Sequence, residues 1–458
     1  MPGHNKLFGT NGIRGVPKKD LTLEFFLEMA QSLGKYFGAV RVCLGHDGRI
    51  SSPTLARAVS GGLMSVGSDV VFLGLVPTPA LQHVVRNSDA GGGVMITASH
   101  NPPEYNGMKV IGNDGVEIPR EDETKIEKIY YGKKYKLADY KGVGTKIVKK
   151  DTVMNYTKAI LSLVDTKKIR KRAIKIVIDS GNGVQALAMP AVLDALGCKT
   201  LSLNSEIDGA FPGRGSEPTP QTLDELSRAV RNFGADIGVG FDGDGDRSVF
   251  CDDKGKVEHG DRSCALLVDH CLSREPGKSV VTNVATSRVI DLIASKKGSK
   301  VLRTKVGSVD VSRRILRTDS LVGLEENGGF FYGPHVPVRD GAMATALMLE
   351  LLASTSKSLS ALLSSLPKLH QTKLKFKLSK NDISLVLKEV ERQARGKTVD
   401  KTDGIKVWES DETWVLVRPS GTEPIVRLFA ESDAANTLDK AVKRYVEIIQ
   451  RFEEGTKK

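Results

Sequence analysis

Short apolar runs alternate with longer amphipathic stretches over most of the chain. Three copies of one pattern, in the order strand, helix, glycine and strand, cover residues 40–73, 174–203 and 279–304. The short apolar runs predict buried strands, and the spaced apolar positions between them predict helices. A strand, a helix and a second strand form the βαβ signature, so we predict three similar α/β domains with mixed, largely parallel sheets. The glycines that would end the helices are Gly67, Gly197 and Gly298.

The pattern changes after about residue 367. Strand-like runs at 404–408, 414–417 and 425–430 precede an amphipathic stretch at 434–452, which predicts a smaller C-terminal α+β domain. The transitions between domains fall in polar, lysine-rich or proline-containing stretches, which are typical of boundaries. The four domains that we expect cover residues 1–155, 156–256, 257–368 and 369–458.

The composition is that of a soluble globular protein. With 40% hydrophobic and 27% charged residues, the 458-residue chain can bury a sizeable core. The N-terminus lacks an apolar stretch behind a basic start, and no apolar run approaches the length of a membrane span. We therefore expect no secretory signal and no contact with a membrane. The five cysteines include no C-x-x-C pair, which favours a reducing, cytoplasmic location without structural zinc.

The chain is basic, with a net charge of +12. Such a charge favours nucleic acid, an anionic membrane surface or a phosphorylated small substrate as partner. The basic run at 167–172 has no interleaved aromatic residues and lies between predicted elements, so a solvated linker or helix end is the better interpretation. We expect no nucleic acid; a nucleic-acid-binding protein would show steeply salt-dependent binding.

A Ser-His pair follows an apolar strand in residues 91–103, where Asn-Pro-Pro forces a turn. Ser99 would then lie on a rigid elbow at the carboxyl end of a strand, where open α/β sheets bind ligands. An ordinary turn, in which the Ser99 hydroxyl bonds to the backbone, fits this segment equally well. A nucleophile needs activating neighbours, and His100 and Lys109 are close in sequence.

Three aspartates separated by single residues end the apolar strand in residues 236–247. The glycines beside Asp242, Asp244 and Asp246 let the carboxylates converge on one point, as Mg²⁺ or Ca²⁺ requires. The alternative to a metal site is an ordinary solvated acidic turn. An EF-hand loop is excluded because its sixth position holds Arg247 instead of glycine. A phosphatase whose nucleophile is the first aspartate of Asp-x-Asp remains a rival, and it would release phosphate without Ser99.

Two further segments carry polar groups in glycine loops. Residues 324–329 offer Glu325 and Asn327, which suit hydrogen bonds to vicinal hydroxyls, although a plain acidic turn is about as compatible. Residues 418–424 combine a guanidinium, two hydroxyls and a glycine, and thus form a phosphate cradle in kind. Arg427 could add a second charge, and the alternative is an ordinary Pro-Ser-Gly turn.

Together with Lys-Leu-Phe-Gly-Thr-Asn-Gly-Ile-Arg-Gly at residues 6–15, these four segments resemble the α-D-phosphohexomutase family in order and spacing. The resemblance covers essentially the whole chain. The N-terminal segment looks most like the phosphoglucosamine mutase branch, and the Glu-Glu-Asn-Gly-Gly segment looks like an archaeal branch that includes phosphomannomutase/phosphoglucomutase. The resemblance implies three similar α/β domains and a C-terminal α+β domain around a central cleft.

The resemblance also implies a reaction. Ser99 would carry a phosphoryl group and give it to a hexose 6-phosphate, which would form a hexose 1,6-bisphosphate, turn around and leave as the 1-phosphate. One Mg²⁺ would be held by Asp242, Asp244, Asp246 and an oxygen of the phosphoserine. The bisphosphate would also serve as activator. Glucosamine 6-phosphate ranks first as substrate, and a phosphomannomutase/phosphoglucomutase is the alternative.

By position, the resemblance implies a proton-transfer role for Lys109, with His100 and Arg247 beside it as catalytic groups. We expect burial beside Arg247 to lower the pKa of Lys109, with nearby phosphate opposing this change. The residues expected to bind the sugar phosphate are Arg14, Lys305, Glu325, Asn327, Arg418, Ser420, Gly421, Thr422 and Arg427.

Two residues depart from the family pattern. Gly329 stands where some members have a histidine that works in acid/base chemistry, and His335 is the nearby candidate to replace it. His46 stands where arginine is usual, so we assign no role to its loop. The expected partner is a small sugar phosphate, and a homodimer is compatible with the sequence.

Overall fold

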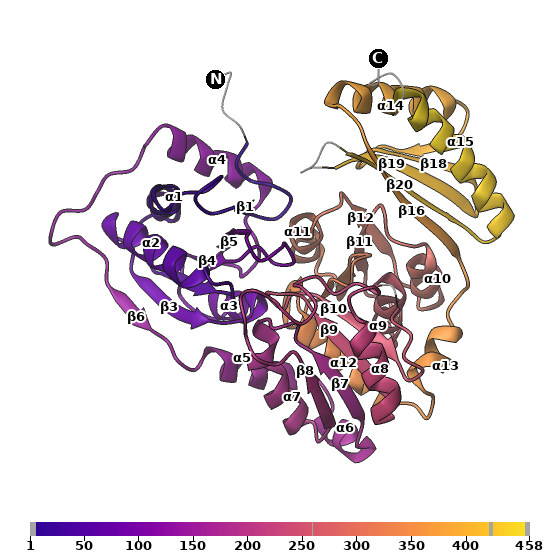
Figure 1. Cartoon of the computed structure of the whole chain (residues 1–458), viewed down its shortest axis with the longest axis horizontal. Coiled ribbons are helices and arrows are strands. Elements are labelled where there is room, and N and C mark those ends of the chain that lie inside the picture. Colours follow the sequence, from indigo (N-terminus) through magenta and orange to yellow (C-terminus); the bar gives the residue numbers. More distant parts are fainter. Residues whose placement is uncertain (1–5, 259, 421–424, 454–458) are drawn as a thin grey trace.

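The chain forms four units, each built around its own β-sheet (Figure 1). The computed structural model describes residues 6–258, 260–420 and 425–453. We number the units one to four in chain order. Figure 1 shows unit four set apart from the other three, and its helices α14 and α15 lie together on one face of its sheet.

Unit one has a six-stranded mixed sheet in the order β1-β5-β4-β2-β3-β6. Strands β4, β2, β3 and β6 are parallel, while β5 and β1 are antiparallel to their neighbours. The strands are β1 (Ile13–Gly15), β2 (Val42–His46), β3 (Val70–Leu75), β4 (Gly92–Ile96), β5 (Asn106–Gly112) and β6 (Lys146–Val148). The helices are α1 (Leu23–Phe37), α2 (Ser52–Ser65), α3 (Thr78–Arg86) and α4 (Arg120–Tyr131).

Unit two has a four-stranded sheet in the order β10-β9-β7-β8, in which only β10 is antiparallel. Its strands are β7 (Lys175–Asp179), β8 (Lys199–Leu203), β9 (Ile237–Phe241) and β10 (Ser248–Asp252). The helices are α5 (Thr152–Leu161), α6 (Thr166–Arg172), α7 (Met189–Ala195) and α8 (Asp224–Phe233), with a short 3₁₀ turn η1 (Val184–Leu187).

Unit three has a five-stranded sheet in the order β12-β11-β13-β14-β15, parallel from β12 to β13 and antiparallel beyond. Its strands are β11 (Val280–Asn283), β12 (Val301–Thr304), β13 (Val322–Leu324), β14 (Phe330–Tyr332) and β15 (Val336–Arg339). The helices are α9 (Gly260–Arg274), α10 (Val289–Lys296), α11 (Ser308–Thr318), α12 (Gly341–Ala353) and α13 (Leu359–Ser364).

Unit four is an antiparallel sheet in the order β16-β20-β19-β18-β17 with two helices. Its strands are β16 (His370–Lys377), β17 (Thr398–Asp400), β18 (Ile405–Ser410), β19 (Thr413–Pro419) and β20 (Ile425–Ser432). The helices are α14 (Lys380–Gln393) and α15 (Ala435–Glu453). The predicted fold class, three α/β units with mixed, largely parallel sheets and a C-terminal α+β unit, is confirmed.

The first three units share one core, whereas unit four has its own. One apolar cluster contains side chains from α3, α5, α7, α9 and α12. Helix α12 is apolar nearly all round, as a helix buried on every side must be. Unit four joins unit three through a small apolar cluster that includes Val284 and Trp414. Within the described residues we found no helix with the length and hydrophobicity needed to cross a membrane.

Candidate active site

Ser99 lies in a tight turn just after β4, in a left-handed backbone conformation with φ +53°. This conformation is uncommon for a residue other than glycine, and it persists only where the surroundings hold it. Arg49 provides that hold. Its guanidinium donates to the carbonyl oxygens of Ser99 at 2.8 Å, Asn101 at 2.6 Å, Pro102 at 2.6 Å and Tyr105 at 2.9 Å. These four hydrogen bonds hold the backbone of the turn in place.

Asp47 supports the same turn from the end of the neighbouring strand β2. Its carboxylate accepts from the Thr97 hydroxyl at 2.7 Å, the Ser52 hydroxyl at 2.6 Å and the Arg49 Nε at 3.2 Å. Sequence reasoning missed Asp47 and Arg49. The available signal was their position after an apolar strand, because β2 and β4 are parallel neighbours and end at the same edge of the sheet.

The three aspartates follow β9 of unit two and meet the Ser99 turn of unit one. The Ser99 hydroxyl donates to Asp242 Oδ2 at 2.9 Å, and both residues are buried. One carboxylate oxygen from each of Asp242, Asp244 and Asp246 lies within 4.8 Å of the others. We call residues 242–246 the aspartate loop. The structure therefore brings the expected nucleophile and the expected metal ligands together.

The aspartate loop fits a hard cation. Asp244 Oδ1 and Asp246 Oδ1 are buried and accept no hydrogen bond from any described residue. Buried carboxylate oxygens without a donor are costly, and a cation would satisfy them. The set consists of oxygen ligands alone, which suits Mg²⁺ better than a soft metal.

Lys109, on β5, reaches the aspartate loop. Its Nζ donates to Asp244 Oδ2 and Asp246 Oδ2, each at 2.7 Å. Burial acts to lower the pKa of Lys109, but the charges of these carboxylates outweigh it and raise the pKa above its usual value. The expectation that burial beside Arg247 lowers this pKa is wrong for this arrangement. Lys109 is therefore held as an ammonium, paired with both carboxylates.

The pKa values of Asp242 and Asp244 are shifted in opposite directions because their surroundings differ. Burial and the neighbouring charges of Asp246 and Asp244 raise the pKa of Asp242. Burial has the same tendency at Asp244, but Lys109 and the Thr78 hydroxyl, which donates to Oδ2 at 2.6 Å, hold its pKa well below the usual range. Thr78 begins α3 of unit one and was missed by sequence reasoning, because nothing in its local pattern indicates a partner 166 residues away.

Three more of the expected site residues lie where the Ser99 turn meets the aspartate loop. His100 Nδ1 is 3.4 Å from the Ser99 hydroxyl oxygen, and burial together with Arg247 lowers the pKa of His100 well below its usual value, so the imidazole is neutral. Arg14 donates to the Asn101 side chain at 2.8 Å, and burial lowers its pKa to about 10. The backbone N–H of Arg247 donates to Asp242 Oδ1 at 3.1 Å.

The loop at 325–329 follows β13 of unit three, and we call it the sugar loop for the contacts that the sequence leads us to expect there. Glu325 is buried, and burial raises its pKa to about 7 against the opposing charge of Arg339. Asn327 Oδ1 accepts from the backbone N–H of Gly329 at 3.2 Å. Arg339, at the end of β15, donates to Asp246 Oδ2 at 2.5 Å and lies 3.5 Å from Glu325 Oε2. Arg339 thus connects the sugar loop to the aspartate loop.

His335, the candidate to replace a histidine at position 329, contacts residues outside the Ser99 turn, the aspartate loop and the sugar loop. Its ring stacks on His83 with the centroids 5.1 Å apart and lies 5.9 Å from the Tyr156 ring. Its Nε2 lies 3.4 Å from Asp340 Oδ2. These contacts join α3, α5 and the start of α12, so the structure gives His335 a place at the junction of the first three units.

The expected phosphate cradle begins in unit four with Arg418, near the end of β19. Arg418 Nε donates to Asp403 Oδ2 at 3.0 Å, and the same oxygen accepts from the backbone N–H of Val306 at 3.0 Å. Asp403 therefore holds Arg418 beside the unit-three segment that carries the exposed Lys305. Arg427 faces Arg418 across the strand pair, and the Ser420 backbone N–H donates to Ile425 at 2.9 Å. Gly421 and Thr422 lie outside the described residues.

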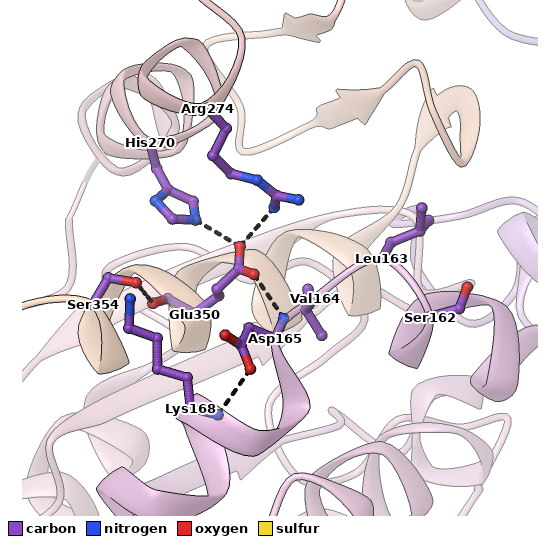
Figure 2. Close-up of a pocket in the computed structure, with 9 residues that line it drawn as sticks. All are labelled: Ser162, Leu163, Val164, Asp165, Lys168, His270, Arg274, Glu350 and Ser354. Carbon is purple, nitrogen blue, oxygen red and sulfur yellow. Dashed lines mark hydrogen bonds and ion pairs between the residues drawn. The ribbon is translucent and has the colours of Figure 1, made fainter.

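A cavity of about 430 Å³ lies elsewhere, between units two and three (Figure 2). Glu350 on α12 accepts from His270 at 2.8 Å, from Arg274 at 2.7 Å and from the backbone N–H of Asp165 at 2.7 Å. All three donors bind one carboxylate. Because Asp165 belongs to unit two and Glu350 to unit three, the cluster joins the two units. None of the residues expected in the active site lines this cavity.

The sequence matches the phosphoglucomutase/phosphomannomutase family in four consecutive segments, each on one unit of the fold. The alpha/beta/alpha domains I, II and III match residues 5–137, 154–255 and 259–370, and the C-terminal domain matches residues 374–448. The chain belongs to this family. Membership in this mutase family agrees with the resemblance found in the sequence and argues against the aspartate-nucleophile phosphatase.

Relatives and solved structures support the same family. A phosphoglucosamine/phosphogalactosamine mutase from Sulfurisphaera tokodaii is 42% identical over 453 residues, covering 96% of this chain and 99% of the relative. A phosphoglucomutase/phosphomannomutase from Thermococcus kodakarensis is 40% identical and covers 99% of each chain. The crystal structure of a phosphoglucomutase/phosphomannomutase family protein from Burkholderia thailandensis has a TM-score of 0.88 at 28% identity over 98% of both chains.

Proposed function

We propose that this phosphohexomutase interconverts hexose 6-phosphates and hexose 1-phosphates through a phosphorylated Ser99 and a hexose 1,6-bisphosphate. The observation that carries the proposal is the Ser99 hydroxyl 2.9 Å from Asp242, in a buried turn that meets a convergent set of carboxylates. A serine held in this turn presents its hydroxyl to the aspartate loop. That is the geometry that a covalent phosphoryl carrier needs.

Each reacting group has a task in this scheme. The Ser99 oxygen forms a bond to phosphorus in one half of the reaction and breaks it in the other. Lys109 holds a proton at Nζ that it can give to the Ser99 oxygen as the phosphoryl group leaves, while the attacking sugar hydroxyl gives up its own proton to solvent. In the reverse half the Ser99 hydroxyl returns its proton to Lys109, and the sugar oxygen takes one up. Arg14, held by Asn101, and the exposed Lys305 supply positive charge for the phosphate that does not react.

The aspartate loop would hold one Mg²⁺ through Asp242, Asp244 and Asp246. When bound, magnesium neutralises negative charge on the transferring phosphoryl group. A hexose 1,6-bisphosphate would act as activator, because a chain that has lost its phosphate regains it only from a donor with two phosphates.

Glucosamine 6-phosphate is the substrate that we rank first. The segment at residues 6–15 and the 42% identity to the Sulfurisphaera tokodaii enzyme, which is named for hexosamine phosphates, support this ranking. The 40% identity to the Thermococcus kodakarensis phosphoglucomutase/phosphomannomutase keeps glucose and mannose phosphates as the alternative. We further propose a cytoplasmic location, supported by five free cysteines. A homodimer stays a prediction.

A turnover panel tests the proposal. Glucosamine, glucose and mannose 6-phosphates are each supplied with Mg²⁺ and a trace of the matching 1,6-bisphosphate, and formation of the 1-phosphate is followed. We expect kcat/KM to be highest for glucosamine 6-phosphate. A higher value for glucose or mannose reverses the ranking but keeps the mutase, whereas release of inorganic phosphate without isomerisation overturns the mutase.

The role of Ser99 is tested separately. Ser99→Ala should lose turnover by several orders of magnitude, because covalent transfer then has no carrier. Mass analysis of peptides from active wild-type enzyme should find phosphate on Ser99. An alanine variant that remains fast, together with an unphosphorylated wild-type peptide, would rule out this carrier.

A further inference from the structure

Arg339 occupies the space beside Gly329 in the sugar loop. A Cβ added at Gly329 would lie 2.6 Å from Arg339 Cδ and 3.0 Å from its Cγ. A contact of 2.6 Å is shorter than real Cβ contacts, so a side chain at 329 would force the observed Arg339 to shift. Strand pairing fixes this placement, because Arg339 on β15 faces Phe331 on β14 and the backbone N–H of Asp340 donates to Phe330 at 3.0 Å.

The guanidinium of Arg339 retains unused hydrogen-bonding capacity. One terminal nitrogen donates to Asp246 and the other lies near Glu325, but Nε is buried and meets no acceptor among the described residues. Glu325 Oε2 is likewise buried and accepts no hydrogen bond there. Both side chains are at most 5% exposed. Arg339 Nε and Glu325 Oε2 are thus a buried donor and a buried acceptor that form no hydrogen bond among the described residues, although the two side chains form an ion pair at 3.5 Å. Unused hydrogen-bonding groups of this kind are costly unless a ligand joins them.

The chemistry of the pair indicates what would join them. A guanidinium only donates, and an ionised carboxylate only accepts, whereas a hydroxyl does both. A sugar hydroxyl could accept from Arg339 Nε and donate to Glu325 Oε2 at once. An ammonium group could not do so, because it has no lone pair for the arginine and carries the same charge. The pair therefore suits a ring hydroxyl on a carbon other than one that bears an amine.

We propose that Arg339 binds a ring hydroxyl of the hexose phosphate jointly with Glu325, with its aliphatic stem in the space that a Cβ at 329 would fill. This assignment deepens the proposed mutase function and rests on it. Arg339 holds and orients the sugar between the sugar loop and the aspartate loop, and it transfers no proton. The alternative is a purely structural Arg339 that only joins units two and three.

The test compares substrate hydroxyls in two enzymes. The 2-deoxy, 3-deoxy and 4-deoxy analogues of the hexose 6-phosphate that wild type turns over best are assayed with wild type and with Arg339→Met. In wild type, loss of the bound hydroxyl should lower kcat/KM about 10- to 100-fold. In Arg339→Met, the parent substrate should lose a similar factor, and that one analogue should suffer little further loss. The other two analogues should show the same loss in both enzymes.

A structural role gives a different result. If Arg339→Met leaves kcat/KM of the parent substrate within about threefold of wild type, or if every deoxy penalty is unchanged in the variant, the proposal is overturned. Arg274→Met is the matched control, since Arg274 forms an ion pair with Glu350 beside the separate cavity of Figure 2. It should leave the deoxy penalties as in wild type.

A second pair of variants keeps the proposal testable if Arg339→Met fails to fold. Gly329→Ala retains Arg339 but pushes on its Cδ, so it should lower kcat/KM and reduce the same deoxy penalty. Where Arg339→Met does fold, the double variant Gly329→Ala/Arg339→Met should be no worse than Arg339→Met alone. If the losses in kcat/KM of the two single variants add in the double variant, the claim that residue 329 and Arg339 compete for one space is overturned. If wild type isomerises none of the sugar phosphates, the mutase function itself has failed, which is a separate result.

Discussion

Lys109 shows how one residue takes its properties from partners far along the chain. The lysine is buried, and burial alone would make it lose its proton more easily, but two carboxylates at 2.7 Å reverse this effect. Lys109→Met should lower turnover at least about 10²-fold while substrate still binds, because the leaving oxygen then lacks its acid. Steady-state kinetics measure this loss, with exposed Lys128→Met as control. Wild-type turnover in Lys109→Met would transfer the proton role to another group.

The aspartate loop should make the stability of the folded chain depend on Mg²⁺. Mg²⁺ should raise the unfolding midpoint of wild type, since a ligand that binds only the folded state stabilises it. Asp244→Asn should abolish most of this rise and most of the activity, whereas Asp194→Asn on the exposed face of α7 should change neither. Full activity after exhaustive chelation would contradict the magnesium site.

At the scale of elements, the Ser99 turn depends on Arg49 as much as on its own sequence. Arg49→Lys keeps the positive charge but replaces the planar guanidinium with an ammonium, which cannot donate to all four carbonyl oxygens. The turn should therefore relax, and turnover should fall about 10- to 100-fold. Kinetics and the unfolding midpoint would be compared with those of Arg57→Lys, an exposed position on α2. Equal turnover in the two variants would show that the turn holds without Arg49.

The elements of the α/β units could be predicted because their signals are local. Gly67, Gly197 and Gly298 follow helices in the left-handed region, at φ +88°, +67° and +64°, as their place in the repeated pattern indicates. The predicted strand at 425–430 is likewise found, as β20 at Ile425–Ser432. Strand β16 was missed because most of its residues are exposed, so it carries little apolar signal.

The site could be predicted only where motif and chemistry coincide in one segment. Ser99 and Asp242 each follow an apolar strand, and this common position indicates that they meet at sheet edges. Arg339 and Thr78 have no such signal, because their partners lie 93 and 166 residues away and the pairing arises from the assembly of units. The raised pKa of Lys109 could not be predicted for the same reason.

At the scale of the whole molecule, the site exists only when three units are assembled. Unit one supplies Ser99 and Lys109, unit two supplies the aspartate loop, and unit three supplies Glu325. The shared core of α3, α5 and α12 holds these units together. Unit four is joined to unit three by its own contacts, among them the buried Lys406, whose Nζ donates to the Val284 carbonyl oxygen at 2.9 Å.

The cluster at Glu350 should make the stability of the junction between units two and three depend on pH. Burial acts to raise the pKa of Glu350, but the hydrogen bonds from His270 and Asp165 outweigh it, so the folded pKa is below the ordinary 4.5. The stabilisation is therefore complete above about pH 4.5 and is lost as the pH falls through the lower folded value. Glu350→Gln should lower stability by about 1–3 kcal/mol at pH 7 and remove this acid dependence.

Thermal unfolding between pH 3 and 8 measures the effect. Exposed Glu225→Gln on α8 serves as the control and should follow wild type throughout. A Glu350→Gln variant whose midpoint tracks wild type at every pH would show that the cluster contributes nothing to the junction.

The depth of Ser99 also bears on how long a phosphorylated chain would last. The residue is 0% exposed, with Arg49 behind its turn and the aspartate loop in front. Water would have little access to a phosphoryl group there, so spontaneous hydrolysis should be slow compared with transfer to a sugar. The resting enzyme would then be the phosphorylated one, which persists between encounters with substrate. Protein freshly isolated from cells should turn over without added bisphosphate, and its dependence on that donor should grow only with prolonged storage.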